Sequence, residues 1–179
     1  MSPVIPVLLV TGPIGVGKTT VANEMSAVLD RRRMPHALVD MDALRWRYPA
    51  DPSDPFSAAL GLQNLAAVWR NYQAAGAERL VLVDIVESRA QLPQCGAAIP
   101  GATLVVVRLR AAAATLAVRI AQREVGTGYA WHLERSAELA ALMEREQVED
   151  LAVENDGRPL ADVAGEVLRR CNWLSASER

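Results

Sequence analysis

The chain has 179 residues, of which 51% are hydrophobic and only 4% aromatic, and its formal net charge is −2. This length fits one domain with a sizeable core, and the alanine-rich apolar content predicts a helix-rich soluble globule. The near-neutral charge argues against a broad nucleic-acid or membrane surface, and no apolar run reaches the roughly 20 residues that span a bilayer.

The first ten residues, MSPVIPVLLV, predict a strand and not a signal peptide, because they lack a basic segment and a small-residue cleavage site. The two cysteines, Cys95 and Cys171, are too few and too far apart for a disulfide framework or a zinc site. We therefore expect a cytoplasmic protein.

Apolar runs alternate with segments of helical periodicity along the whole chain, which indicates α/β units and a mostly parallel sheet. Asp54-Pro55 has the form of a helix N-cap followed by proline at the first helical position. The predicted strands are 5–10, 37–39, 80–83, 103–107 and 150–153, and the predicted helices are 18–30, 55–75, 111–124, 131–146 and 160–171.

A glycine-rich segment, GPIGVGKTT, follows the first predicted strand and matches the phosphate-loop pattern G-x-x-x-x-G-K-[ST]. Its Lys18 is the single lysine in a chain with 19 basic residues. Glycines allow a tight loop whose N–H groups face phosphate oxygens, the lysine reaches the β- and γ-phosphates, and Thr19 offers a hydroxyl to Mg²⁺. We predict an ATP site formed by Gly12, Pro13, Ile14, Gly15, Val16, Gly17, Lys18, Thr19 and Thr20.

Carboxylates follow the second and third predicted strands. Asp84 ends the third apolar run and resembles the Walker B aspartate that holds Mg²⁺. Asp40 and Asp42 follow the second strand, where ligands of open α/β sheets bind. One of the pair can act as a general base or aid Mg²⁺ coordination while the other fixes the substrate. Alternatively, Asp42 only caps a helix beginning near Ala43.

Arginines near these carboxylates are candidates for holding an anionic acceptor. Arg45 and Arg47 follow the paired aspartates, and Arg89 follows the third strand. Guanidinium groups bind carboxylates and phosphates bidentately, which suits this role. Each arginine is also compatible with a solvated helix surface.

These motifs, in this order, resemble the small P-loop kinases, which include adenylylsulfate, gluconate, shikimate and nucleoside monophosphate kinases. The resemblance implies an α/β, three-layer P-loop NTPase fold over residues 1–179, with a five-stranded parallel sheet in the order 2-3-1-4-5. It also implies a mobile helical lid at about 119–135.

In such kinases, lid arginines close over the transferring phosphates, which assigns this role to Arg119, Arg123 and Arg135. The glycines of GTG, 126–128, would supply a flexible connection, and ENDGRP would border the adenine through Asn155 and Arg158. His132 is expected to be structural or solvated.

The sequence thus predicts an ATP- and Mg²⁺-dependent kinase that phosphorylates a small, hydroxylated and anionic acceptor, with Lys18, Asp40 and Arg123 as catalytic residues. The alternatives are a nucleoside monophosphate kinase, an antibiotic phosphotransferase, or a nucleotide-binding regulatory protein that phosphorylates no small acceptor. A nucleic-acid kinase is disfavoured by the acidic balance. The oligomeric state and the acceptor's identity stay open.

Overall fold

The computed structural model describes residues 4–123 and 128–175. The strands form one five-stranded parallel sheet in the order β2-β3-β1-β4-β5, as the resemblance implied. β1 and β4 pair over the longest stretch, from Ile5 opposite Ala102 to Thr11 opposite Arg108. The strands are β1 (Ile5–Thr11), β2 (Ala37–Asp40), β3 (Leu80–Val83), β4 (Ala102–Arg110) and β5 (Leu151–Glu154).

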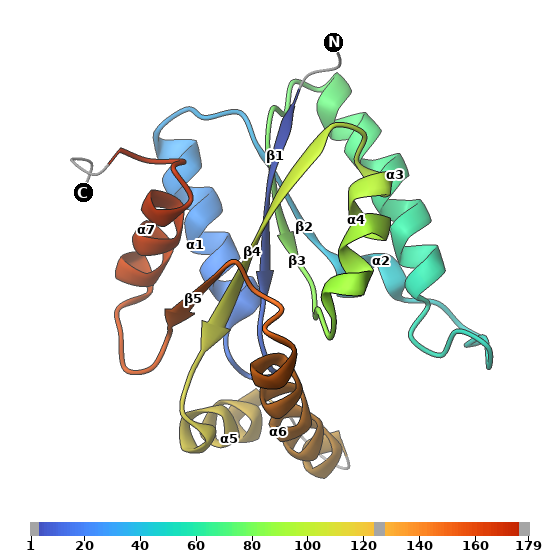
Figure 1. Ribbon diagram of the computed structural model, residues 1–179, viewed down its shortest axis with the longest axis vertical. Coiled ribbons are helices and arrows are strands. Elements are labelled where there is room, and N and C mark those ends of the chain that lie inside the picture. The colour runs from blue at the N-terminus through green and yellow to red at the C-terminus, as the bar shows by residue number, and fades with distance from the viewer. Residues whose placement is uncertain (1–3, 124–127, 176–179) are drawn as a thin grey trace.

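Helices cover both faces of this sheet, so the predicted three-layer α/β fold is confirmed (Figure 1). α1 and α7 lie on one face, α3 and α4 lie on the other, and α5 and α6 lie beyond the carboxyl ends of the strands. The helices are α1 (Lys18–Arg31), α2 (Met41–Arg45), α3 (Ala58–Ala74), the 3₁₀ turn η1 (Arg89–Gln91), α4 (Leu92–Ala98), α5 (Ala113–Arg123), α6 (Gly128–Glu146) and α7 (Leu160–Arg170).

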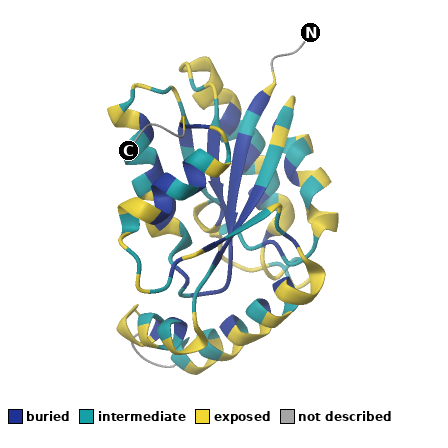
Figure 2. Cartoon of the chain, turned by 60° about the vertical axis from the view of Figure 1, so that its left-hand side comes forward, coloured by how far each residue is buried: buried dark blue, intermediate teal, exposed yellow. Residues whose placement is uncertain are grey.

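The alternation of side chains along the central strand divides the core in two. Val7 and Leu9 of β1 pack with the residues under α3 and α4, whereas Leu8 and Val10 pack with those under α1 and α7. All four side chains are buried, as expected for a parallel strand with helices on both sides (Figure 2). The apolar run that predicted β1 therefore serves both halves of the core.

The start of α3 differs from the prediction. The helix begins at Ala58, not at Pro55, because the chain first makes a turn. In this turn, the Asp54 carbonyl oxygen accepts a hydrogen bond from the Ser57 N–H at 2.9 Å. The Asp54 carboxylate still caps the helix, accepting from the N–H groups of Ala58 at 2.8 Å and Ala59 at 3.0 Å. In the part of the chain described, no helix is both long and apolar enough to cross a membrane.

Candidate active site

The phosphate loop joins β1 to α1 and depends on glycine where other elements approach it. Gly12 has φ 144° and Gly15 has φ 82°, both in the region that side-chain-bearing residues rarely adopt. A Cβ atom on Gly12 would lie 2.7 Å from the Leu109 carbonyl oxygen, and one on Gly15 would lie 2.8 Å from Ile120. The loop is therefore held tightly between the end of β4 and helix α5.

Lys18 is positioned inside this loop by two backbone carbonyls. Its Nζ donates to the carbonyl oxygens of Gly12 at 2.9 Å and Pro13 at 3.1 Å. The Lys18 pKa is lowered to about 8, chiefly by burial and also by the charge of Arg123, while nearby carboxylates, Asp42 foremost, oppose the shift. The ammonium is thus poorly solvated and suited to an anionic ligand.

Thr19 and Asp40 are in direct contact. The Thr19 hydroxyl donates to Asp40 Oδ2 at 2.7 Å, which leaves the hydroxyl lone pairs available to a cation. Asp40 Oδ1 accepts from the backbone N–H of Asp42 at 3.1 Å, so Asp40 is the N-cap of α2. The side chain of Asp42 itself is 81% exposed. The two predicted aspartates therefore occupy different environments.

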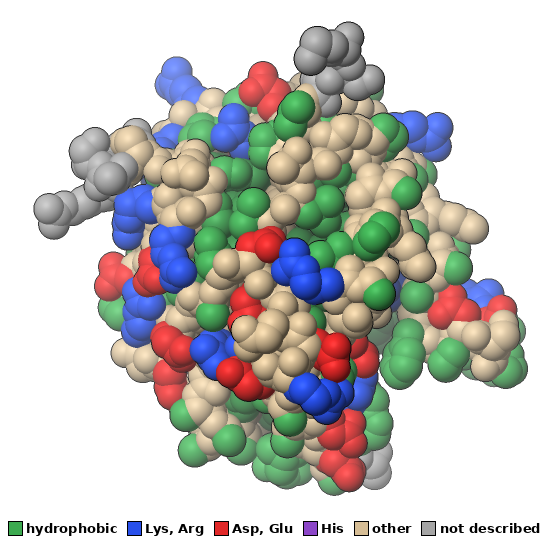
Figure 3. All heavy atoms as spheres, in the orientation of Figure 1, with side chains coloured by type: hydrophobic (Ala, Val, Ile, Leu, Met, Phe, Trp, Pro, Cys, Tyr) green, Lys and Arg blue, Asp and Glu red, His purple; other side chains and the backbone are tan. Residues whose placement is uncertain are grey.

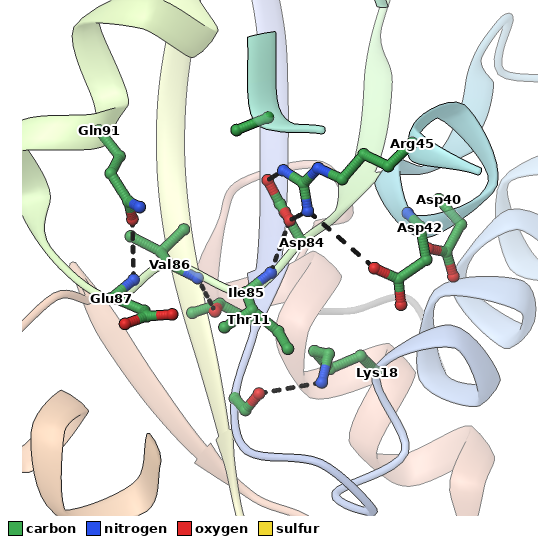
Figure 4. A network of polar contacts seen from close by, with 12 residues as sticks. Thr11, Lys18, Asp40, Asp42, Arg45, Asp84, Ile85, Val86, Glu87 and Gln91 are labelled. Carbon is green, nitrogen blue, oxygen red and sulfur yellow. Dashed lines mark hydrogen bonds and ion pairs between the residues drawn. The ribbon is translucent and has the colours of Figure 1, made fainter. Parts of the chain in front are cut away.

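Asp84, the predicted magnesium ligand, is paired with Arg45. The two side chains form a bidentate ion pair at 2.6 and 2.8 Å, although 39 residues separate them in the sequence (Figure 4). Asp84 Oδ1 also accepts from the Ile85 N–H at 2.8 Å. Burial raises the Asp84 pKa, while the hydrogen bonds from Arg45 oppose the shift. Arg45 also lies 4.0 Å from Asp42.

Two of the predicted nucleotide residues from the C-terminal half, Arg119 and Asn155, meet the phosphate loop at Val16. The Val16 carbonyl oxygen accepts from Arg119 at 3.1 Å and from the buried Asn155 amide at 2.6 Å. Arg119 also donates to the Asn155 carbonyl at 2.9 Å. Arg158 donates to the Glu154 carbonyl at 2.9 Å and pairs with Glu166 at 2.7 Å. The segment after β5 and helix α5 are thereby tied to the loop.

Three further predicted arginines are paired with carboxylates. Arg135 contacts Glu87 and lies 3.2 Å from Glu138. Arg47 lies 3.4 Å from Asp51. Arg89 donates to Asp150 at 3.0 Å and to the Val148 carbonyl at 3.1 Å, tying η1 to the segment before β5. The GTG connection predicted for the lid falls largely outside the described residues.

One cavity of about 1050 Å³ connects most of these groups. It is lined by the phosphate loop, by Asp40 and Asp42, and by Arg119, Arg123 and Asn155. Arg45, Asp84, Arg135 and Arg158 also line it, whereas the described lining residues do not include Arg47 or Arg89.

The cavity is also lined by residues to which the sequence analysis gave no role, namely Trp46, Phe56, Glu87, Gln91, Gln122, Trp131 and His132. Glu87 follows Asp84 closely in the DIVES segment, and this spacing could have indicated that Glu87 lines the same site. The anchoring role of Ser136, whose buried hydroxyl donates to the Ile14 carbonyl at 2.7 Å, has no local sequence signal.

A magnesium ion fits this set of residues in the way that P-loop sites hold it. Among the described residues, no group of three or more His, Cys, Asp or Glu side chains is placed to hold a metal ion. Mg²⁺ commonly needs only one or two protein ligands, because substrate phosphates and water complete its shell. Thr19 and Asp40 line the cavity beside Lys18 and would meet that requirement, and Asp84, whose two carboxylate oxygens both accept from Arg45, lines the same cavity.

No protein-family model matches the chain, and no curated protein matches its sequence. Solved structures match it closely in length. A gluconokinase from Sinorhizobium meliloti 1021 aligns over 97% of this chain and 95% of its own, with a TM-score of 0.60 and 22% identity. A shikimate kinase from Acinetobacter baumannii aligns over 97% of this chain and 96% of its own, with a TM-score of 0.59 and 16% identity.

A tunicamycin resistance protein from Deinococcus radiodurans matches over 93% of this chain and 95% of its own, with a TM-score of 0.61 and 17% identity. Identities this low establish the fold and not the substrate. The strand order, the phosphate loop and these structural matches lead to one conclusion, which confirms the resemblance at the level of fold: the chain has the fold of the small P-loop kinases.

Proposed function

We propose that this protein transfers the γ-phosphoryl group of ATP to a hydroxyl group of a small molecule. The observation that carries the proposal is a single cavity lined by both the Lys18 phosphate cradle and the Asp40–Asp42 pair. A phosphoryl donor and an acceptor could therefore meet within the same cavity. The kinases among the similar structures support a phosphotransferase.

The donor end suits a nucleotide triphosphate. The inward-facing loop, the Lys18 ammonium and the N-terminus of α1 together favour phosphate oxygens. Arg119 and Arg123 add positive charge to the same cavity, where a transferring phosphoryl group develops negative charge. Bound Mg²⁺ would neutralise phosphate charge, and Thr19, with Asp40 and Asp84 nearby, is the group of residues that would hold it.

The two aspartates suit different tasks. Both carboxylate oxygens of Asp40 are engaged, one by the Thr19 hydroxyl and one by the Asp42 N–H. Asp40, the catalytic aspartate of the sequence analysis, is thereby suited to orienting the magnesium-side hydroxyl. Asp42 is exposed and lines the cavity, so its carboxylate is the better candidate to take the acceptor's proton.

In the proposed reaction, a proton passes from the acceptor to Asp42 and a phosphoryl group passes from ATP to the acceptor. The acceptor's O–H bond breaks as Asp42 takes the proton, and the freed oxygen forms a bond to the γ-phosphorus. The bond from that phosphorus to the β–γ bridging oxygen breaks, and ADP leaves. The Lys18 side chain, already inside the loop, remains beside the phosphates throughout.

The test is ADP release from Mg·ATP with a panel of acceptors: nucleoside monophosphates, adenylylsulfate, sugar acids, shikimate and hydroxylated antibiotics. We expect stimulation by a hydroxylated compound that is lost in Lys18→Ala and falls at least 100-fold in Asp42→Asn. Asp40→Asn should instead raise the Mg²⁺ concentration needed for half-maximal rate. The matched control is Asp51→Asn, an exposed aspartate outside the described cavity lining.

Other outcomes would separate the alternative functions. Stimulation only by nucleoside monophosphates that survives Asp42→Asn would refute the general base, because an ionised phosphate acceptor needs none. Tight ATP binding with slow hydrolysis that no acceptor changes would refute the kinase proposal and favour a nucleotide-binding regulator.

A further inference from the structure

The arginines expected to hold an anionic acceptor already have carboxylate partners within the protein. Arg45 pairs with Asp84, and Arg135 pairs with Glu87. Arg47 and Arg89 pair with Asp51 and Asp150, and neither belongs to the described lining of the cavity. An anionic acceptor would compete with these carboxylates for the guanidinium donors. The positive charge expected for an anionic acceptor is therefore neutralised internally.

Apart from Lys18 and Arg123, whose charges would face the phosphates of the donor, the charged side chains at this end of the cavity are mostly carboxylates. We call this region the acceptor end and define it by the charged lining residues contributed by α2, its N-cap, the segment after β3, and α6. The Asp42 side chain is 81% exposed. Within the described lining, the acceptor end has four carboxylates and two guanidiniums, namely Asp40, Asp42, Asp84, Glu87, Arg45 and Arg135.

Aromatic side chains stand at the rim of the same region. Trp46 is 91% exposed, Phe56 is 64% exposed and Trp131 is 52% exposed, and all three line the cavity. Apolar side chains gather on the projecting segment between α2 and α3, at the lower right of Figure 3. Large apolar residues exposed together at a cavity mark a ligand-binding surface more often than a folding requirement.

Hydrogen bonds fix the positions from which these rings project. The Asp54 carboxylate caps α3 just after Phe56, and Asn64 donates to the Leu44 carbonyl at 2.8 Å just before Trp46. Across the cavity, the Trp131 ring meets the His132 ring edge-on, with centroids 5.0 Å apart. The aromatic rim is therefore held by folded elements on both sides.

From these observations we infer that the acceptor is a hydroxylated small molecule with an aromatic or similarly flat apolar ring and no negative charge. This inference rests on the proposed function, since it names the acceptor class of that site. Trp46, Phe56 and Trp131 would contact the ring faces, and the exposed Asp42 carboxylate would repel an anion and favour a neutral or cationic group. It replaces the anionic acceptor expected from the sequence.

The test uses three probes with the same phenol ring and a different charge: tyramine, 2-(4-hydroxyphenyl)ethanol and 4-hydroxyphenylacetate. Their binding to the full chain is measured calorimetrically with Mg·ADP present, and phosphoryl transfer is measured separately with Mg·ATP. We expect the cationic and neutral probes to bind at least tenfold more tightly than the anion. Trp46→Ala and Trp131→Ala should each weaken that binding about tenfold while leaving nucleotide affinity unchanged.

Tyr48→Ala is the matched control, because Tyr48 is 96% exposed in the same segment but absent from the described lining. The inference would be overturned if the anionic probe bound as tightly as the other two, or if no probe bound. It would also be overturned if the tryptophan variants bound the probes as tightly as Tyr48→Ala does. Binding as expected, but with no phosphoryl transfer to these probes or any other acceptor, would refute the proposed function alone. Efficient transfer to sugar acids, insensitive to both tryptophan variants, would refute the inference alone.

Discussion

The Arg45–Asp84 pair should stabilise the fold through a strongly coupled interaction that double-mutant analysis can measure. Removing one partner of a fully buried pair costs about 3–5 kcal/mol, whereas exposed pairs contribute about 0–1 kcal/mol. Arg45 and Asp84 keep 22% and 16% side-chain exposure, and their contact is bidentate. We therefore expect about 2–3 kcal/mol of destabilisation from Arg45→Met or from Asp84→Ala.

Urea unfolding of both single variants and the double variant gives the coupling energy. We expect the double variant to lose about 2 kcal/mol less than the sum of the singles, because it leaves no unpaired charge behind. The same cycle on Arg31 and Glu24, whose side chains are 62% and 25% exposed, is the control and should give less than about 0.5 kcal/mol. Additive losses at Arg45 and Asp84 would refute this reasoning.

Three further predictions concern the phosphate loop and the Arg45–Asp84 pair. Since burial lowers the free-enzyme pKa of Lys18 to about 8 and phosphates favour its charged form, ATP affinity should fall as pH rises above about 8, and titrations of Lys18→Ala should lose this dependence. Gly61→Ala should lower the urea midpoint despite alanine's helix propensity, because its Cβ would lie 2.8 Å from Arg45 Cγ; an unchanged midpoint would mean that Arg45 moves freely. Gly15→Ala should weaken ATP binding at least tenfold by pressing on Ile120, and calorimetry showing normal affinity would contradict the tight loop.

The strands could be predicted because their signals are local, whereas their order in the sheet was implied by the resemblance to small P-loop kinases. Each strand coincides with an apolar run. The nine residues of the phosphate-loop motif also indicate that a strand comes before them and a helix after them. Helix limits were less predictable. α2 begins at Met41 with Asp40 as its N-cap, whereas the sequence suggested only a helix near Ala43 capped by Asp42, as one alternative. α4 is short and was not predicted at all.

The pairing of the site's charges could not be predicted in the same way. Arg45 is separated from Asp84 by 39 residues, and Arg135 is separated from Glu87 by 48. An arginine near a ligand site serves the ligand or a neighbouring carboxylate, depending on which group the fold brings closer. Tertiary packing decides which group is closer. The sequence could therefore identify these arginines as candidate site residues but could not predict their partners.

The single lysine illustrates where sequence and structure give one answer. Eighteen of the 19 basic residues are arginine, and the exception lies inside the phosphate loop. There the cationic group meets two carbonyl oxygens, from Gly12 and Pro13. A guanidinium carries five N–H donors in a planar fork, and burying it in this loop would leave several donors without acceptors. A compact ammonium can use both carbonyls and then turn to phosphate oxygens, so lysine is the cation that this loop can accommodate.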